Sequence, residues 1–308
     1  MRAAGIRTIG GGVEPLELPA PREPAADEVL LRVRAAGVGV WEDYVRTGGW
    51  DIGRQPPLAL GVEAAGVVVA ADPEVEHLRP GDWALTYPLQ LRDQGSWAEL
   101  LLAPAALTVV KPPALSWAEA AALPVPGITA VQVVEKTLRV ARGERVLVSG
   151  AGGVTGGALV QVAVAAGAEV LATAGATSAA RVRSYGAREV FDYRDPGWPE
   201  RLCEVCGGGV DAAVNAAPRG AAAALRAVRD GGRLVTITGD LPPADRRIAV
   251  ADLVIAPEPA DLARAVELAG GLELRLGVAA TLPLERAAAA LELAASGAPG
   301  AVALTLGP

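Results

Sequence analysis

The chain has 308 residues, of which 51% are hydrophobic and 20% charged, and its formal net charge is −7. The length predicts two domains of roughly 100–200 residues each, and the composition is typical of a globular protein with a large core. An acidic chain without a block of Lys and Arg is a poor partner for nucleic acid or an anionic membrane. Residues 1–11 lack the apolar core of a secretory signal, and no apolar run reaches the roughly 18 residues that span a bilayer, so we expect a cytoplasmic protein.

The first 120 residues are rich in strand-forming residues separated by Gly and Pro turns. Residues 27–40, 60–71 and 95–104 alternate or cluster these residues, which predicts an antiparallel, barrel-like domain. A helix is predicted to begin at Ser116, because Ser116 and Glu119 have the spacing of a capping box.

From about residue 145, short apolar strands alternate with helical stretches. Strands are predicted at 145–150, 169–175, 189–193, 211–217, 233–239 and 248–257, and helices at 156–168, 178–187 and 221–232. This alternation indicates βαβ units and a parallel sheet. Two further helices, at 259–271 and 283–297, precede a terminal strand at 300–306. Because this strand has no obvious place in the parallel sheet, we expect it to return to the N-terminal barrel.

A glycine-rich turn is predicted after the strand at 145–150. Its spacing, Ala151-x-Gly153-x-x-Gly156 overlapped by Gly150-x-Gly152, is typical of a dinucleotide-binding turn. The turn lets the backbone approach a pyrophosphate, and the helix N-terminus offers free N–H groups to the phosphates. Such a turn can also be a plain connection, but the order strand, turn, helix, strand favours a nucleotide site. The predicted pyrophosphate-binding residues are Gly150, Ala151, Gly152, Gly153, Val154, Thr155 and Gly156.

The end of the next strand indicates which dinucleotide binds. NAD sites usually have Asp or Glu roughly 20 residues beyond the first glycine, to bind the ribose 2′-hydroxyl. Residues 171–183 contain no acidic residue, so nothing there would repel a 2′-phosphate. The predicted contacts at this end are Thr173, Thr177, Ser178 and Arg181, which together favour NADPH. The alternative is that Arg181 and Arg183 lie on a solvated helix face.

Several stretches are similar to a known family, among them LRPGDWAL at 78–85, VLVSGAGGVTGGALVQVA at 146–163 and YGAREVFDY at 185–193. The chain resembles the medium-chain dehydrogenase/reductase superfamily, most closely the zinc-free quinone oxidoreductases related to zeta-crystallin. The resemblance implies an α/β protein with two domains and NADPH as cofactor. A discontinuous GroES-like, β-barrel-type catalytic domain would comprise 1–120 and 260–308. A doubly wound parallel-sheet (Rossmann) domain would comprise 121–259.

Zinc-dependent relatives place a Cys near Gly39, a His-Glu pair where this chain has Val62-Glu63, and a cluster of four cysteines. Without Cys or His ligands at these positions we expect no metal site. The chain's cysteines, Cys203 and Cys206, are predicted at a helix end, where we interpret them as unreactive thiols, and its one histidine, His77, is predicted on the surface.

The resemblance implies hydride transfer to an enone or quinone, after which a proton must reach the neighbouring carbon. Tyr44 matches the family's active-site tyrosine and is the candidate proton donor or orienting group; the alternative is a surface tyrosine. Thr129 matches a position near the nicotinamide, unless its hydroxyl bonds its own helix. Asn215 and Thr238 end strands of the parallel sheet, where doubly wound folds bind ligands.

The chain departs from the family at Gly39, where the usual residue is Asn, and at Glu42, where Asp is frequent. Trp41, Trp50 and Tyr87 could line a substrate pocket or pack in the core. Other functions that fit are an enoyl reductase acting on carrier- or CoA-bound chains, and a non-catalytic NADPH-binding sensor or scaffold. We also expect a homodimer, joined through the apolar edge of the strand at 248–257.

Overall fold

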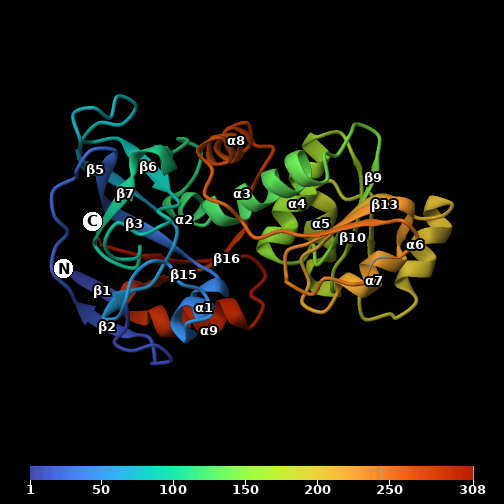
Figure 1. The fold of residues 1–308 in the computed structure, drawn as a ribbon, viewed down its shortest axis with the longest axis horizontal. Coiled ribbons are helices and arrows are strands. Elements are labelled where there is room, and N and C mark those ends of the chain that lie inside the picture. Colours follow the sequence, from blue (N-terminus) through green and yellow to red (C-terminus); the bar gives the residue numbers. More distant parts are fainter. Residues whose placement is uncertain (244, 308) are drawn as a thin grey trace. The chain divides into compact units, whose positions relative to one another are not determined.

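The computed structural model describes residues 1–243 and 245–307. The chain divides into two compact units, and both of its ends lie in the first (Figure 1). The first unit comprises Met1–Val125, Pro257–Gly270 and Leu276–Pro308, and the second comprises Pro126–Ala256 and Gly271–Arg275. The expected α/β fold class, with a GroES-like domain and a parallel-sheet domain, is confirmed.

Three short segments lie in a different unit from the one that the sequence predicts. Residues 121–125 and 257–259 belong to the first unit, and Gly271–Arg275 belongs to the second. The physical reason for the last of these is a pair of hydrogen bonds from the buried Gln161. Its Nε2 donates to the Arg275 carbonyl (2.9 Å), and its Oε1 accepts from the Arg275 N–H (2.9 Å).

The first unit is built on a seven-stranded sheet and a three-stranded sheet, with the strand order β15-β16-β3-β5-β6-β8 and β2-β1-β4; β7 also pairs with β3. The strands are β1 (Arg2–Ile6), β2 (Glu14–Glu17), β3 (Glu28–Val38), β4 (Leu58–Ala59), β5 (Ala64–Ala71), β6 (Trp83–Thr86), β7 (Leu100–Pro104), β8 (Thr108–Val110), β15 (Val278–Pro283) and β16 (Ala301–Thr305). The helices are α1 (Trp41–Thr47), η1 (Ala105–Leu107), α2 (Trp117–Ala121), α8 (Pro259–Gly270), η3 (Leu284–Arg286) and α9 (Ala287–Ala295).

The terminal strand returns to the N-terminal sheet as the sequence predicts, since β16 pairs antiparallel with β3, with Val302 opposite Val38. The predicted capping box is also present. Ser116 accepts a hydrogen bond from the Glu119 N–H, and the Glu119 carboxylate accepts from the Ser116 N–H, so α2 begins where the sequence indicates. Lys111 fixes α2 to the sheet, because its ammonium lies 5.3 Å and 5.2 Å from the ring centroids of Trp83 and Trp117.

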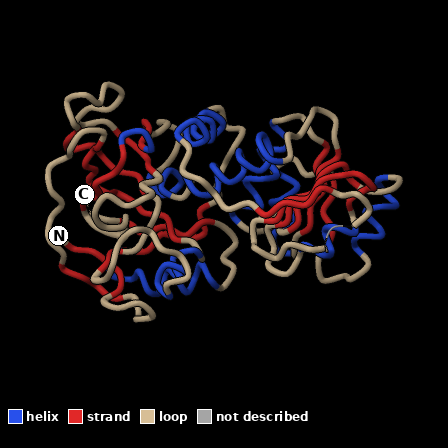
Figure 2. The backbone as a smooth tube through the Cα atoms, in the orientation of Figure 1, coloured by secondary structure: helices blue, strands red, loops and turns tan. Residues whose placement is uncertain are grey.

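The second unit is one parallel six-stranded sheet in the order β11-β10-β9-β12-β13-β14, with helices on both faces (Figure 2). Its strands are β9 (Arg145–Ser149), β10 (Glu169–Thr173), β11 (Glu189–Phe191), β12 (Val210–Asn215), β13 (Val228–Thr236) and β14 (Ala249–Asp252). Its helices are α3 (Pro124–Val131), which begins in the first unit, the π-helix η2 (Gln132–Thr137), α4 (Val154–Ala165), α5 (Ala176–Ser184), α6 (Trp198–Cys206) and α7 (Ala221–Arg226). The strand order reverses between β9 and β12, which is where sheets of this topology bind nucleotides.

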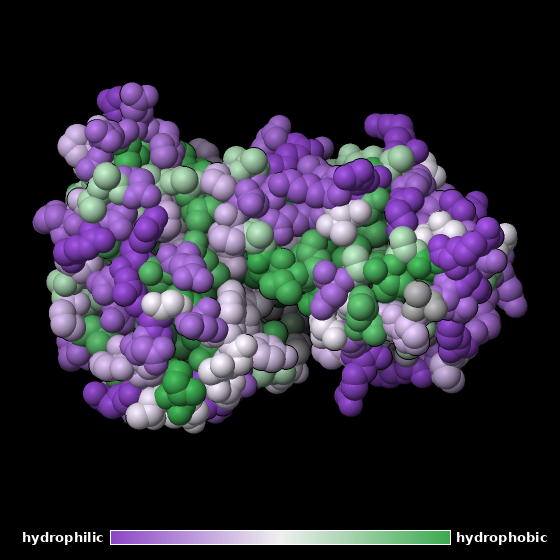
Figure 3. Space-filling model, viewed as in Figure 1, coloured by the Kyte–Doolittle hydropathy of each residue, from purple (hydrophilic) through white to green (hydrophobic). Residues whose placement is uncertain are grey.

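Two predicted elements are shorter or differently placed than expected. The helix predicted at 221–232 ends at Arg226, because the chain then enters β13 and pairs in register with β12. The strand predicted at 248–257 is only Ala249–Asp252, since β13 ends at Thr236, the partner of Asp252, and offers nothing to pair with beyond it. The apolar residues 253–255 therefore lie outside the edge strand, and Val254 is 83% exposed. Hydrophilic residues cover much of the face drawn in Figure 3, and hydrophobic residues are exposed at several places among them.

Candidate functional site

The glycine-rich turn follows β9 directly. It contacts the carboxyl end of β10 and the residues that follow β12. Gly150 has φ +85°, a conformation that side chains other than glycine rarely adopt. A Cβ at Gly150 would lie 2.9 Å from the backbone of Ala216 and Ala217, which follow β12. Thr173, at the end of β10, accepts from the Gly150 N–H through Oγ1 and from the Ala151 N–H through its carbonyl, both at 3.0 Å. The turn is therefore held by the two strands that flank β9.

The last glycine of the motif is required by close packing. A Cβ at Gly156 would lie 2.1 Å from the Gly150 carbonyl oxygen, so only glycine fits where α4 passes the turn. The N-cap residue of α4 is Gly153, and no side chain caps this end. The first N–H groups of the helix, those of Val154 and Thr155 among them, are thus left for an anion such as a pyrophosphate.

The other end of the predicted cofactor site is formed by β10 and α5. Arg181 Nη2 donates to the Gly152 carbonyl (2.7 Å), which links α5 to the glycine turn. Ser178 lies next to the glycine turn, because its Oγ would be 2.6 Å from a Cβ at Gly152. The same hydroxyl donates a hydrogen bond to the Gly175 carbonyl (3.2 Å). Thr177 is on the same first turn of α5. The structure brings these residues to one edge of the sheet.

Sequence reasoning missed a second arginine at this edge. Arg194 follows β11, and its Nη1 would be 2.9 Å from a Cβ at Gly175, the N-cap residue of α5. Its guanidinium stacks on Tyr193 (4.8 Å to the ring centroid) and makes a 3.6 Å ion pair with Asp192. The available signal was the adjacency of β10 and β11, which brings the end of each strand to the same edge.

Asn215 and Thr238 lie together at the ends of β12 and β13. Asn215 is fully buried and is the register partner of Ser149, the last residue of β9. Its Nδ2 is within 3.0 Å of Thr238 Oγ1 and 3.1 Å of Asp240 Oδ1. Asp240 also accepts from the hydroxyls of Thr236 (2.7 Å) and Thr238 (2.6 Å). This network fixes the polar groups at the point where the strand order reverses.

The two candidate catalytic residues belong to different units. Tyr44 lies on α1 of the first unit and is 62% exposed, whereas Thr129 lies on α3 in the second unit and is buried.

The departure at Gly39 has a steric explanation. A Cβ at Gly39 would lie 2.2 Å from the ring of Trp41, so the indole covers the place where the usual Asn side chain would begin. Glu42 is completely buried, and its Oε2 accepts from the Gly39 N–H (2.8 Å). Tyr87 is also completely buried, so it is a core residue and not an open pocket wall. Trp50 is partly exposed.

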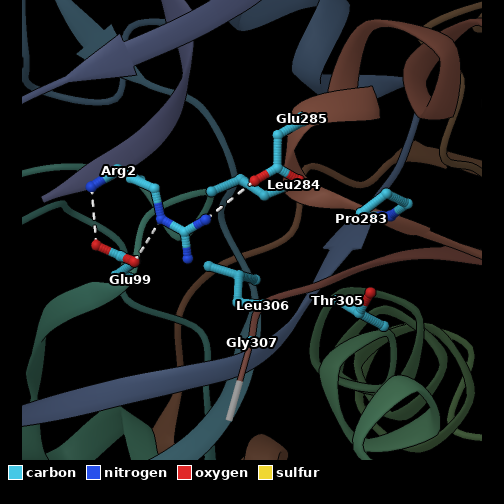
Figure 4. A pocket seen from close by; sticks show the side chains of 8 residues that line it. All are labelled: Arg2, Glu99, Pro283, Leu284, Glu285, Thr305, Leu306 and Gly307. Carbon is cyan, nitrogen blue, oxygen red and sulfur yellow. Dashed lines mark hydrogen bonds and ion pairs between the residues drawn. The ribbon is translucent and has the colours of Figure 1, made fainter.

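A pocket of about 370 Å³ opens within the first unit (Figure 4). Its one cation, Arg2, pairs with two carboxylates, Glu99 (2.7 Å) and Glu285 (3.2 Å), so the charged groups that line the pocket sum to −1. The Arg2 hydrogen bonds lower the pKa of Glu99, which keeps that carboxyl ionised. No charged side chain of this pocket is left to bind a phosphate.

The comparisons with known proteins agree with this geometry. Residues 25–114 match the model of the alcohol dehydrogenase GroES-like domain, and residues 154–258 match that of the zinc-binding dehydrogenase domain. The quinone oxidoreductase of Rattus norvegicus is 31% identical over 246 residues, which are 77% of this chain and 73% of the rat protein. That of Mus musculus is 31% identical over 219 residues, or 70% of this chain and 65% of the mouse protein, which is less than two thirds of its length.

The chain belongs to the quinone oxidoreductase family of the medium-chain dehydrogenase/reductase superfamily. Solved structures of this superfamily overlay on the whole chain. A structure described as an NAD-dependent alcohol dehydrogenase is 31% identical, with a TM-score of 0.92 and 100% of both chains covered. A mycobacterial protein solved in complex with NADPH is 25% identical, with a TM-score of 0.85, covering 99% of this chain and 100% of that one.

Zinc, which the name of the matched domain implies, does not fit the donor set of this quinone oxidoreductase family member. Among residues 1–243 and 245–307, no group of three or more His, Cys, Asp and Glu side chains could hold a metal ion. His77 is exposed, and its Nε2 lies 3.0 Å from the Ala105 carbonyl. Burial raises the pKa of Cys203 and Cys206, which are free thiols at α6, so neither is an activated thiolate. In the described part of the chain, no helix is long and apolar enough to cross a membrane.

Proposed function

We propose that this protein is an NADPH-dependent, zinc-independent reductase that transfers a hydride to an activated C=C bond or a quinone. The observation that carries the proposal is the edge of the second unit, where a glycine turn and helix N-terminus lie beside two arginines, Arg181 and Arg194. A dianionic ribose 2′-phosphate would be stabilised by two guanidinium groups. No acidic residue occupies residues 171–183, where an NAD site usually has one.

The cofactor, when bound, supplies the hydride at its nicotinamide ring. The residues of this chain would bind and orient it. The N–H groups at the start of α4 would hold the pyrophosphate, and Thr177, Ser178, Arg181 and Arg194 the phosphorylated ribose. Asn215 and Thr238 would contact the nicotinamide half at the ends of β12 and β13.

The proton that completes the reduction needs a donor in the chain. The Tyr44 hydroxyl is our candidate, either as the donor to the carbon next to the reduced one or as the group that orients the carbonyl. Thr129 would donate a hydrogen bond near the nicotinamide. Charge that develops on the substrate carbonyl oxygen must be stabilised by such hydrogen bonds, since we propose no metal to do so.

The relatives differ in the nucleotide that their descriptions name, one NAD and one NADPH. In our proposal the arginines favour NADPH, because NAD lacks the ribose 2′-phosphate that a guanidinium group would bind. The preference is testable by fluorescence titration of the protein with NADPH and NADH. Tighter binding of NADH would contradict the proposal.

The reaction is tested by NADPH oxidation over a panel of enones, quinones, and CoA-bound and carrier-bound enoyl thioesters. Turnover of simple enones or quinones supports the proposed reductase. Turnover of the thioesters alone would show a biosynthetic enoyl reductase, and tight NADPH binding without any turnover would show a sensor or scaffold.

We also infer a homodimer. The strand β14 is an edge of the six-stranded sheet, and the residues that follow it, 253–255, are apolar and include the exposed Val254. An unpaired edge beside apolar side chains tends to associate, and a second copy of the same edge can pair with it. Light scattering at micromolar concentration should give the dimer mass; a monomer mass would refute this inference.

A further inference from the structure

Three buried polar atoms of the first unit have no hydrogen-bond partner of ordinary length. They are Trp41 Nε1, Glu42 Oε1 and Tyr87 Oη, and in the described part of the chain the only other such side-chain atom is Arg233 Nε, in the second unit. Buried polar groups are normally paired, so three orphans in one unit mark a place that holds something other than ordinary core.

A second buried carboxyl group, that of Glu63, lies close enough to Glu42 and Tyr87 for its charge to act on both. Glu42 is 0% exposed and Glu63 is 1% exposed, and the charge of each acts on Tyr87. Glu42 Oε2 accepts from the Gly39 N–H, and Glu63 Oε2 accepts from the Val125 N–H (2.9 Å). In each carboxyl group Oε2 thus accepts a hydrogen bond from a neutral backbone N–H and not from a cation.

The backbone is shaped to admit this pair. A Cβ at Gly37 would lie 2.3 Å from Glu63 Oε1, so β3 carries glycine where the carboxyl group approaches. The Gly37 N–H also donates to the Glu63 carbonyl (3.2 Å), which fixes the segment that carries the acid. Because a side chain at Gly37 would displace Glu63, the acid belongs to the packing of this unit.

In the described part of the chain no Lys, Arg or His is among the groups that shift the pKa of Glu42 or Glu63, so no cation neutralises the pair there. The groups that act on the two acids are each other, Trp41, and backbone N–H groups of Gly39, Glu42, Val62 and Val125. A buried carboxylate without a cation is strongly disfavoured, and two adjacent ones more so.

We propose that Glu42 and Glu63 form a proton-binding site, in which the pair holds at least one proton at neutral pH. The ligand of this site is a proton, bound in the core of the first unit. On alkalinisation the O–H bond of a carboxyl group breaks, its proton goes to solvent and the pair gains one negative charge. The inference does not depend on the proposed reductase activity, and nothing in the cofactor site is part of it.

The electrostatics of the site agree with its geometry. Burial raises the pKa of Glu42 to about 8, and backbone hydrogen bonds offset this only in part. Burial likewise raises the pKa of Glu63 well above its ordinary value, and the charge of Glu42 raises it further. Burial, and then the charges of Glu63 and Glu42, raise the pKa of Tyr87, so the phenol stays protonated throughout.

Infrared spectroscopy of the cofactor-free protein tests the site directly. At pH 7 the wild type should show the C=O stretch of a protonated carboxylic acid, which should disappear in the double variant Glu42→Gln/Glu63→Gln. The control Glu74→Gln removes an exposed carboxyl group and should leave the band unchanged. A wild type without the band at pH 7 would overturn the proposal.

Stability gives a second readout that also covers a poorly folding double variant. The folded pKa of each acid is raised, so the native state binds more protons than the unfolded state between their titrations. The free energy of unfolding should therefore fall as the pH rises from about 5 through 8, and fall less in the single variants Glu42→Gln and Glu63→Gln. Parallel pH profiles of the wild type and both single variants would contradict the proton-binding site, whether or not NADPH is ever oxidised.

Discussion

Arg181 and Gly152 are joined by a hydrogen bond of 2.7 Å from the guanidinium to the carbonyl of the glycine turn. This bond leaves Arg181 with further N–H groups at the edge where the adenosine ribose is expected. Ser178 connects the same turn to Gly175, and the guanidinium of Arg194 also lies against Gly175. Two guanidinium groups therefore converge on one small region of the second unit.

Replacing Arg194 by Ala should weaken NADPH binding about 10- to 100-fold, the usual effect of losing a hydrogen bond to a charged group. NADH lacks the 2′-phosphate, so its dissociation constant should change by less than about twofold. Fluorescence titration of both nucleotides with the variant measures this difference. Arg183→Ala is the matched control, because Arg183 is exposed on the same helix. Equal losses for NADPH and NADH would show that Arg194 does not recognise the phosphate.

Two glycines of the turn should respond differently to replacement by alanine. At Gly156 the added Cβ would lie 2.1 Å from the Gly150 carbonyl, so the backbone must move, and we expect a loss of about 1–3 kcal/mol in stability. At Gly153 the same atom is 3.6 Å away, an ordinary contact, so Gly153→Ala should keep its stability while weakening the binding of both nucleotides. Thermal unfolding and titration of the two variants separate these effects. A stable Gly156→Ala variant would show that α4 does not need this close approach.

The second unit was largely predictable because its signals are local. Strand, glycine turn and helix follow one another within about 30 residues, and the motif Ala151-x-Gly153-x-x-Gly156 in that order of elements indicates the turn. The return of β16 to β3 could be inferred by elimination, since the parallel sheet had no place for it. The predicted helix at 221–232 failed because its second half, after Arg226, pairs as a strand, and tertiary pairing overrides helical composition.

The features that the sequence did not reveal depend on contacts between distant residues. Glu42 and Glu63 are 21 positions apart, and nothing in either stretch distinguishes a buried acid from an exposed one. The contact of the Trp41 ring with Gly39 could not be predicted either, because it depends on the direction of one side chain. Arg194 could have been found only by pairing β10 with β11 before inspecting the residues beyond each strand.

Tyr44→Phe should lower the turnover number about 10²–10⁴-fold if the hydroxyl donates the proton, the range that general acids contribute. Because Tyr44 is 62% exposed, the melting temperature should stay within about 1–2 °C of the wild type. NADPH binding should also be unchanged, since we propose that Tyr44 acts on the substrate and not on the cofactor. Steady-state kinetics with the best enone or quinone of the panel measures the effect. Unchanged turnover would show that Tyr44 is a surface tyrosine and not the proton donor.

Asp240 should make the second unit sensitive to acid. Burial opposes its ionisation, but the hydroxyls of Thr238 and Thr236 donate to its carboxylate and outweigh that effect, so the pKa of Asp240 lies below its ordinary value. The folded state then binds fewer protons at this group than the unfolded state. Its stabilising contribution is present above the unfolded pKa of about 3.8 and is lost as the pH falls through the folded pKa.

Asp240→Asn removes the charge but keeps the shape of the side chain. At pH 7 the variant should be less stable than the wild type by about 1–3 kcal/mol, because hydrogen bonds to an ionised group are replaced by neutral ones. The difference should shrink as the pH falls below about 3.8 and through the folded pKa, where the wild-type carboxyl group also becomes neutral. Urea unfolding at pH 7 and at a series of lower pH values measures it, and Asp230→Asn, at an exposed aspartate of the same unit, is the control. A difference that persists unchanged over the whole acid series would mean that the Asp240 hydrogen bonds act through geometry and not through charge.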